Sequence, residues 1–172
     1  MCGIFGIISS APVDKTELQV LVKHSQQRGM DSSGLIFMDG SDYIVKRADY
    51  AISKLLSEVK LNGADLVMGH SRLITNGLSD NQPVVRDGVA VIHNGIVVNH
   101  ESIWSKINKE RKLQIDTEVI AAIAAECVEN GETLESIPKK ILDLCEGIVA
   151  CALVLPKLGK LCLFSNNGSL YL

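Results

Sequence analysis

The sequence has few of the features that bind nucleic acid or cross a membrane. Its 172 residues include one Trp, three Tyr and three Phe, too few for a platform on which bases stack. The 17 Lys and Arg residues are dispersed among 20 Asp and Glu residues, for a net charge of −3, which argues against an anionic polymer or membrane surface. No apolar run approaches the roughly 18 residues of a membrane span. We therefore expect one globular domain whose partners include no nucleic acid and no membrane.

Closely spaced pairs of metal-binding or redox residues are also missing. Five cysteines stand at positions 2, 127, 145, 151 and 162, and none forms a Cys-x-x-Cys pair. The four histidines show no His-x-x-x-His spacing, so we expect no metal. Because Cys127, Cys151 and Cys162 lie in apolar runs, we interpret them as reduced core residues. We expect a cytoplasmic protein, since the N-terminus also lacks the pattern of a signal peptide.

The second residue is the most informative feature that is present. Removal of Met1 would make Cys2 the N-terminal residue, which would then carry both a thiol and a free α-amine. The α-amine titrates near about pH 8 and the thiol near about pH 8.5, so both groups are usable around neutrality. A nucleophile activated by an N-terminal amine is a known arrangement for acyl transfer. The alternative is that Cys2 only begins a buried strand, as cysteines in apolar runs often do.

Apolar periodicity predicts strands and helices in mixed order. The predicted strands are Gly3–Ser9, Leu35–Met38, Tyr43–Lys46, Asp65–Ser71, Gly88–Ile92, Ile148–Leu155, Lys160–Phe164 and Ser169–Leu172. The predicted helices are one capped by Asp14 and ending near Gln26, then Ala51–Val59, Asn99–Lys109, Thr117–Glu129 and Leu134–Leu144. Strands in antiparallel pairs with helices inserted in groups favour a layered α+β fold over a doubly wound parallel sheet.

Polar segments at the ends of the predicted strands offer groups that an amide-cleaving site needs. Asn94 and Gly95 could supply a side-chain amide and a backbone N–H to an oxyanion, although Asn-Gly is also typical of a hairpin turn. Arg72 could bind a carboxylate with two hydrogen bonds. Asp116 could bind an ammonium group, or it could simply cap the helix that follows it.

Five motifs occur in order between residue 1 and about residue 120, and together they resemble the class II glutamine amidotransferases, which are N-terminal-nucleophile hydrolases. They are Met1-Cys2-Gly3-Ile4-Phe5-Gly6, Arg28-Gly29-Met30-Asp31-Ser32-Ser33-Gly34, His70-Ser71-Arg72 with Thr75 and Gly77, His93-Asn94-Gly95-Ile96 with Asn99-His100-Glu101, and Asp116-Thr117-Glu118-Val119-Ile120. Within the family, the segments 93–101 and 116–120 look most like the glutaminase domain of glucosamine-6-phosphate synthases.

The resemblance implies a four-layer α/β/β/α sandwich of the N-terminal-nucleophile hydrolase type. Residues 1–172 would form one glutaminase domain. Because the chain is shorter than a usual glutaminase domain of this family, we expect the C-terminal part of the fold and any synthase domain to be absent. The resemblance also implies L-glutamine as substrate, no cofactor, and a synthase domain or subunit that uses the ammonia to aminate a sugar phosphate in amino sugar biosynthesis. A homo-oligomer is compatible with it.

The resemblance also implies a role for each matched residue. Cys2 would be the nucleophile, with its own amine as base through a water molecule, and Asn94 and Gly95 would form the oxyanion hole. Arg28 would lie near the nucleophile and order the N-terminal strand. The residues expected to bind glutamine are Arg72, Thr75, Asn76 and Asp116.

The sequence departs from the synthase pattern at three places, and these keep two alternatives open. Leu73 stands where the synthases usually have Trp, and Asn76 where they commonly have His. The stretch Asp80-Asn81-Gln82-Pro83 is closer to amidophosphoribosyltransferases and asparagine synthetases. The first alternative is therefore a glutaminase that serves a nucleotide precursor or an activated aspartate. The second is a non-catalytic domain that binds glutamine or acts as a scaffold.

Overall fold

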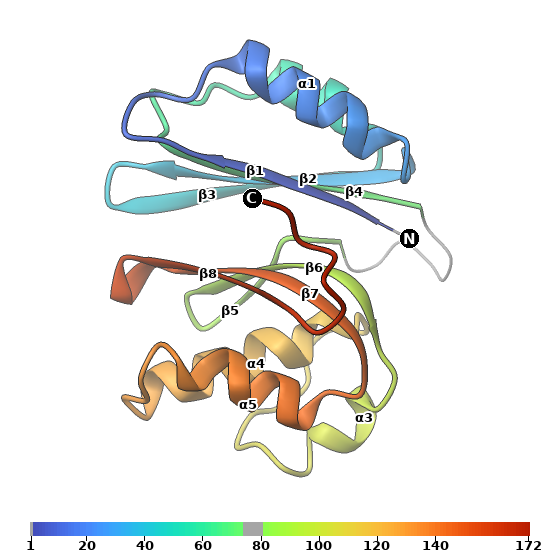
Figure 1. Ribbon diagram of the computed structural model, residues 1–172, viewed down its shortest axis with the longest axis vertical. Coiled ribbons are helices and arrows are strands. Elements are labelled where there is room, and N and C mark those ends of the chain that lie inside the picture. Colours follow the sequence, from blue (N-terminus) through green and yellow to red (C-terminus); the bar gives the residue numbers. More distant parts are fainter. Residues whose placement is uncertain (1, 74–80) are drawn as a thin grey trace. The chain divides into compact units, whose positions relative to one another are not determined.

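The computed structural model describes residues 2–73 and 81–172, and the chain folds as two compact units, Met1–Pro83 and Val84–Leu172. Each unit contains one antiparallel sheet of four strands, and helices cover one face of each sheet (Figure 1). The predicted α+β class is confirmed. Each unit supplies one helix layer and one sheet layer, which are the components of the predicted sandwich.

The first unit pairs its strands in the order β1-β4-β2-β3. Its elements are β1 (Gly3–Ile8), α1 (Lys15–Gln26), β2 (Ser32–Asp39), β3 (Asp42–Ala48), α2 (Ile52–Glu58) and β4 (Leu66–Arg72). The predicted cap of α1 is confirmed, because the Asp14 carboxylate accepts a hydrogen bond of 2.8 Å from the Thr16 N–H. Leu18 and Val22 of α1 pack with Leu35 of β2 in the core of this unit.

The second unit orders its strands β5-β6-β7-β8. Its elements are β5 (Val84–Arg86), β6 (Val89–Val97), α3 (His100–Ile103), α4 (Thr117–Glu129), α5 (Ser136–Leu144), β7 (Gly147–Leu155), the short 3-10 helix η1 (Pro156–Leu158) and β8 (Lys160–Ser165). Within the described residues, no helix is long and apolar enough to cross a membrane.

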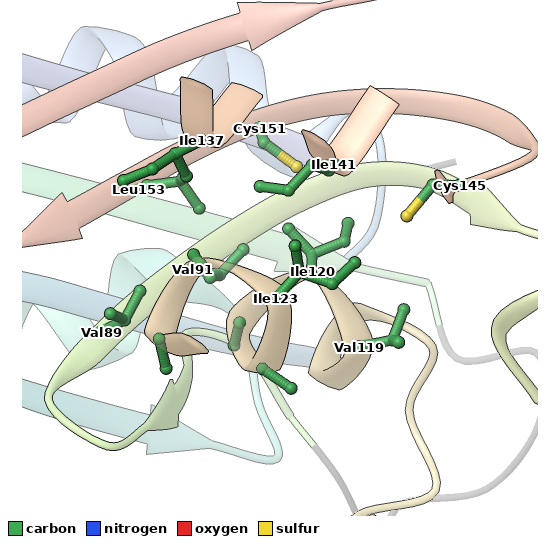
Figure 2. Packing of buried hydrophobic residues seen from close by; sticks show 14 of the residues in the cluster. Val89, Val91, Val119, Ile120, Ile123, Ile137, Ile141, Cys145, Cys151 and Leu153 are labelled. Atoms are coloured by element: carbon green, nitrogen blue, oxygen red, sulfur yellow. The ribbon is translucent and has the colours of Figure 1, made fainter. Parts of the chain in front are cut away.

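The core of the second unit is built around α4, which is buried over most of its length. Side chains of β6, β7, α4 and α5 form one cluster, with Val91 and Ile123 among them (Figure 2). Four alanines of α4, at 121, 122, 124 and 125, are fully or almost fully buried. Small side chains let neighbouring elements approach the helix closely, so α4 and its first residues are held firmly against the sheet.

The largest differences between the predicted elements and the structure are in three segments, and tertiary contacts explain two of them. β6 continues to Val97 because it pairs with β7 as far as Gly147. The predicted strand at Ser169–Leu172 is wrong: the Asn166 side chain accepts from the Val149 N–H and donates to the Gly147 carbonyl, where a further strand residue would bind. The helix predicted at Asn99–Lys109 is only the single turn α3.

The core of the first unit gives a stability test with a control on the same helix. Leu18 is fully buried, whereas Val20 is 55% exposed. We expect Leu18→Ala to lower the free energy of unfolding by about 2–5 kcal/mol, because it removes buried methyl groups and leaves a cavity. Val20→Ala should change it by less than about 0.5 kcal/mol. Urea denaturation followed by circular dichroism measures both; equal losses would contradict the described packing of α1.

Candidate active site

The residues predicted to form the site fall in both units. Cys2, Arg28 and Arg72 belong to the first unit, and Asn94, Gly95 and Asp116 belong to the second. Thr75 and Asn76 lie outside the described residues. We describe the two groups of side chains separately, each in its own unit.

In the first unit, Cys2 lies directly before β1 and next to the end of β4. Gly3 pairs with Ser71 in the antiparallel ladder, so the next residues along the two strands are Cys2 and Arg72. Arg72 is also paired with Ser32 at the start of β2. Cys2 is partly exposed. The register therefore places the backbones of Cys2 and Arg72 next to each other at one end of this sheet.

The end of α1 is packed against this same end of the sheet. Ser25 donates a hydrogen bond of 2.8 Å to the Ser71 hydroxyl, and both side chains are buried. A Cβ at Gly3 would lie 2.6 Å from the Ser25 carbonyl and hydroxyl oxygens. Only a glycine fits between Cys2 and the rest of β1, and this explains the Cys-Gly pair in physical terms.

Arg28 lies in the turn that connects α1 to β2. Its N–H donates to the Ser25 carbonyl at 3.0 Å. A Cβ at Gly29 would lie 2.2 Å from the Leu73 nitrogen, and the Asp31 N–H donates to the Arg72 carbonyl at 3.1 Å. The Arg28 turn is thus in contact with the end of β4, so the backbones of all three predicted residues of this unit meet at one end of the sheet.

In the second unit, Asn94 and Gly95 lie inside β6. Asn94 pairs with Ala150 and Gly95 with Val149 of β7, so the alternative of a hairpin turn is wrong. Gly95 has a φ of 152°, and a Cβ there would lie 1.8 Å from the Ile148 carbonyl oxygen. The backbone at Gly95 therefore departs from an ordinary strand and requires glycine.

Asp116 occupies the N-cap position of α4, as the alternative predicted, but its side chain makes no capping hydrogen bond to the helix. Its Oδ2 instead accepts a hydrogen bond of 2.8 Å from the Val97 N–H at the end of β6. Asp116 therefore links the first turn of α4 to the strand that carries Asn94 and Gly95. Asn94 and Gly95 thus lie in the last part of β6, and Asp116 contacts the end of that strand.

A buried ion pair that the sequence did not reveal supports the segment before Asp116. The guanidinium of Arg86 in β5 donates to the Glu118 carboxylate, and both residues are buried. Glu118 also accepts from the backbone N–H groups of Lys112 and Leu113, the latter at 2.7 Å. Arg86 donates in turn to the Glu110 carbonyl at 3.0 Å. The only sequence feature that could have pointed to this ion pair is the position of Glu118 within the Asp116–Ile120 motif.

Desolvation raises the pKa of four of the five thiols, three of them buried and one, Cys162, partly exposed. Desolvation raises the pKa of Cys127 to about 11 and that of Cys145 to about 12. It also raises the pKa of Cys162, and that of the completely buried Cys151 rises well above its ordinary value. Because the thiolate is the reactive form, these groups are poor nucleophiles at neutral pH. Cys2 remains as the candidate nucleophile.

Metal-binding side chains do not gather in the part of the chain that the structure describes. Among residues 2–73 and 81–172, no three His, Cys, Asp or Glu side chains are grouped so that they could hold a metal ion. The described site residues are a thiol, two guanidinium groups, a carboxylate, an amide and a backbone N–H. These are groups for acyl transfer to sulfur and for binding a zwitterion.

Comparison with known proteins identifies the family. Residues 70–170 match the model of the glutamine amidotransferase domain family. The curated relatives include glutamine–fructose-6-phosphate aminotransferases from Agrobacterium fabrum, 33% identical over 87% of this chain and 26% of the relative, and from Rhizobium meliloti, 28% identical over 100% of this chain and 31% of the relative. The chain thus spans about a quarter to a third of the length of these relatives.

Solved structures give the same result. Glutamine phosphoribosylpyrophosphate amidotransferase from B. subtilis superposes with a TM-score of 0.70 and 26% identity over 90% of this chain and 35% of that chain. A glutamine aminotransferase class-II domain protein from Silicibacter pomeroyi shares the fold, with a TM-score of 0.58 and 14% identity over 98% of this chain and 79% of that chain. The predicted type of fold is confirmed.

The family match covers more than half of the chain, so this chain belongs to the glutamine amidotransferase domain family. The predicted resemblance to the class II glutamine amidotransferases is confirmed. The matched stretch contains Arg72, Asn94, Gly95 and Asp116, while Cys2 and Arg28 precede it. The similarity to the Rhizobium relative covers the whole chain and therefore includes those two residues.

The Arg86–Glu118 pair gives a stability prediction. Glu118→Gln would leave the buried guanidinium of Arg86 without its counter-charge, so we expect a loss of about 3–5 kcal/mol in the free energy of unfolding. The matched control is Asp143→Asn, which removes the exposed ion pair with Lys139 and should cost less than about 1 kcal/mol. Thermal and urea unfolding measure both. Similar losses for the two variants would show that the buried pair does not support the second unit.

Proposed function

We propose that residues 1–172 form a glutaminase domain that hydrolyses the side-chain amide of L-glutamine through a thioester on Cys2. The observation that carries this proposal is the register of β1 on β4, which puts Cys2 next to Arg72 in the first unit. Membership of the glutamine amidotransferase domain family supports it. Desolvation raises the pKa of each of the other four thiols, which makes them poorer nucleophiles.

In the first half-reaction, the Cys2 sulfur attacks the amide carbon after Met1 has been removed. The α-amine of Cys2 takes the thiol proton, through a water molecule, and passes it to the leaving nitrogen. The C–S bond forms as the C–N bond breaks, and ammonia leaves. The negative charge on the amide oxygen is stabilised by the Asn94 amide and the Gly95 N–H.

In the second half-reaction, water attacks the γ-glutamyl thioester. The α-amine now acts as base toward the water, and the proton returns to the sulfur as the C–S bond breaks. The products are glutamate and a free Cys2 thiol. Each step transfers protons and an acyl group only, so it needs neither an oxidant nor a metal.

Substrate binding is assigned to groups that complement a zwitterionic amino acid. Arg72 binds the α-carboxylate with two hydrogen bonds, and Asp116 binds the α-ammonium. Thr75 and Asn76, which follow Arg72 in the sequence, are assigned to the same carboxylate end. Arg28 keeps the N-terminal strand in place through the turn that contacts the end of β4.

The ammonia acceptor that we favour is a sugar phosphate held by a synthase domain or subunit. The support is the similarity to glutamine–fructose-6-phosphate aminotransferases, of which this chain matches only one part. The phosphoribosylpyrophosphate amidotransferase fold and the Asn81-Gln82-Pro83 stretch favour a nucleotide precursor as the second candidate. Amide-labelled glutamine, added with a synthase subunit and each acceptor in turn, would show which one receives the nitrogen.

Covalent labelling tests the nucleophile. The purified chain, shown by intact mass to have lost Met1, should take one equivalent of 6-diazo-5-oxo-norleucine on Cys2 and release ammonia from glutamine. Cys2→Ala should take no label and lose at least about 10³-fold in kcat, because the covalent route is gone. Cys162→Ala, the control at the other partly exposed cysteine, should behave as wild type. A processed wild-type chain without label or activity would favour a non-catalytic glutamine-binding domain.

Steady-state kinetics separate the oxyanion hole from the binding residues. Asn94→Ala should lower kcat by about 10²-fold to 10³-fold with little change in KM, because an oxyanion donor acts mainly in the transition state. Arg72→Ala should instead raise the KM for glutamine. If Asn94→Ala raised KM as strongly as it lowered kcat, Asn94 would be a binding residue. A wild-type KM for Arg72→Ala would remove Arg72 from the site.

A further inference from the structure

His93 links the segments of the second unit that carry Gly95 and Asp116. It is buried in β6, directly before Asn94. Its Nδ1 lies 3.2 Å from the Thr117 hydroxyl at the start of α4, and its Nε2 lies 3.1 Å from the Ile148 carbonyl oxygen in β7. The imidazole of His93 thus connects β6 to the start of α4 and to β7.

The chemistry of the two partners fixes the tautomer. A carbonyl oxygen can only accept, so the proton is on Nε2 and that nitrogen donates to Ile148. In the neutral ring Nδ1 is then the acceptor, and the Thr117 hydroxyl donates to it. Burial lowers the pKa of His93, more than Asp116 nearby raises it, so the neutral ring is favoured at physiological pH.

The Ile148 carbonyl is the group that confines Gly95. It lies where a side chain at position 95 would begin, 1.8 Å from an ideal Cβ, and His93 Nε2 lies 2.8 Å from the same point. The backbone around Ile148 is also held by Asn166, which donates to the Gly147 carbonyl at 2.8 Å and accepts from the Val149 N–H at 3.0 Å. His93 and Asn166 therefore both hold the part of β7 that lies against Gly95.

The Thr117 hydroxyl connects His93 to Asp116. Its oxygen lies 3.4 Å from Asp116 Oδ1, and it has a single proton. Because His93 Nδ1 accepts that proton, the ring holds the Thr117 oxygen beside the Asp116 carboxylate, whose oxygens keep further lone pairs for an ammonium group. Oδ2 is already bound to the Val97 N–H at 2.8 Å. The imidazole therefore acts on the position of the Asp116 carboxylate through Thr117.

We propose that His93 is a positioning residue of the glutaminase site: as a neutral ring it fixes Ile148 against Gly95 and Thr117 beside Asp116. In this assignment His93 does not touch the substrate. It acts through Gly95 of the oxyanion hole and through Asp116, which binds the ammonium group. The inference rests on the function proposed above, and it gives a role to a histidine that the sequence presented only as part of a motif.

Two amide variants test the two contacts one at a time. A glutamine amide reaches the position of Nε2, so His93→Gln can still donate to Ile148. An asparagine amide reaches only the position of Nδ1, so His93→Asn loses the Ile148 contact and keeps the one to Thr117. We expect His93→Asn to lower kcat by about tenfold to a hundredfold, whereas His93→Gln should stay within about threefold of wild type.

Thr117→Val tests the other contact, because it replaces the hydroxyl with a methyl of similar volume. We expect it to raise the KM for glutamine severalfold and to leave kcat nearly unchanged, since Asp116 binds substrate in both states of the reaction. Urea denaturation of each variant confirms that the assayed protein is folded. The Gly95 amide resonance in a ¹H–¹⁵N spectrum should shift in His93→Asn and stay near its wild-type position in His93→Gln.

The outcomes separate this inference from the proposed function. Equal kcat values for the two amide variants, with equal Gly95 shifts, would overturn the positioning role even if the wild type is an active glutaminase. An inactive wild type would overturn the proposed function instead. In that case the Gly95 resonance still decides whether His93 sets the backbone there.

Discussion

The arrangement of the second unit depends on one ladder, the pairing of β6 with β7 as far as Val97 and Gly147. This pairing keeps Asn94 and Gly95 in an extended strand, although Asn-Gly alone favours a turn. It brings the Ile148 carbonyl against Gly95. It also leaves the Val97 N–H directed at Asp116. If the ladder ended at Ile92, none of these contacts would form.

Near this ladder, several buried polar groups hold backbone atoms. Glu118 accepts two backbone N–H groups in addition to Arg86, and His93 and Asn166 bind backbone atoms of β7. A buried charge is costly unless it is paired and hydrogen-bonded. Here the cost of burying Arg86 and Glu118 is offset by hydrogen bonds to the irregular backbone of residues 110–113. Apolar packing around α4 could not orient that segment by itself.

The sequence predicted those features that depend on local patterns, including the α+β class, the Asp14 cap, the central helix α4 and the family. It did not predict the end of β6 or the hydrogen bond from the Val97 N–H to Asp116, because both depend on long-range contacts that outweigh local preference. The ion pair of Arg86 with Glu118 joins residues 32 positions apart and has no local signature. The assignments of Cys2, Arg72 and the oxyanion residues remain predictions.

The desolvation of the four other thiols affects how this protein reacts with electrophiles and oxidants. Thiols whose pKa is raised by desolvation, as in Cys127 and Cys145, are almost wholly protonated in neutral solution and react slowly with peroxide, disulfides or haloacetamides. Of the five thiols, Cys2 is therefore the one that we expect to react fastest. We expect mild electrophiles built on an amino-acid scaffold to modify Cys2 selectively. During storage in air, Cys2 should be oxidised long before the cysteines of the core.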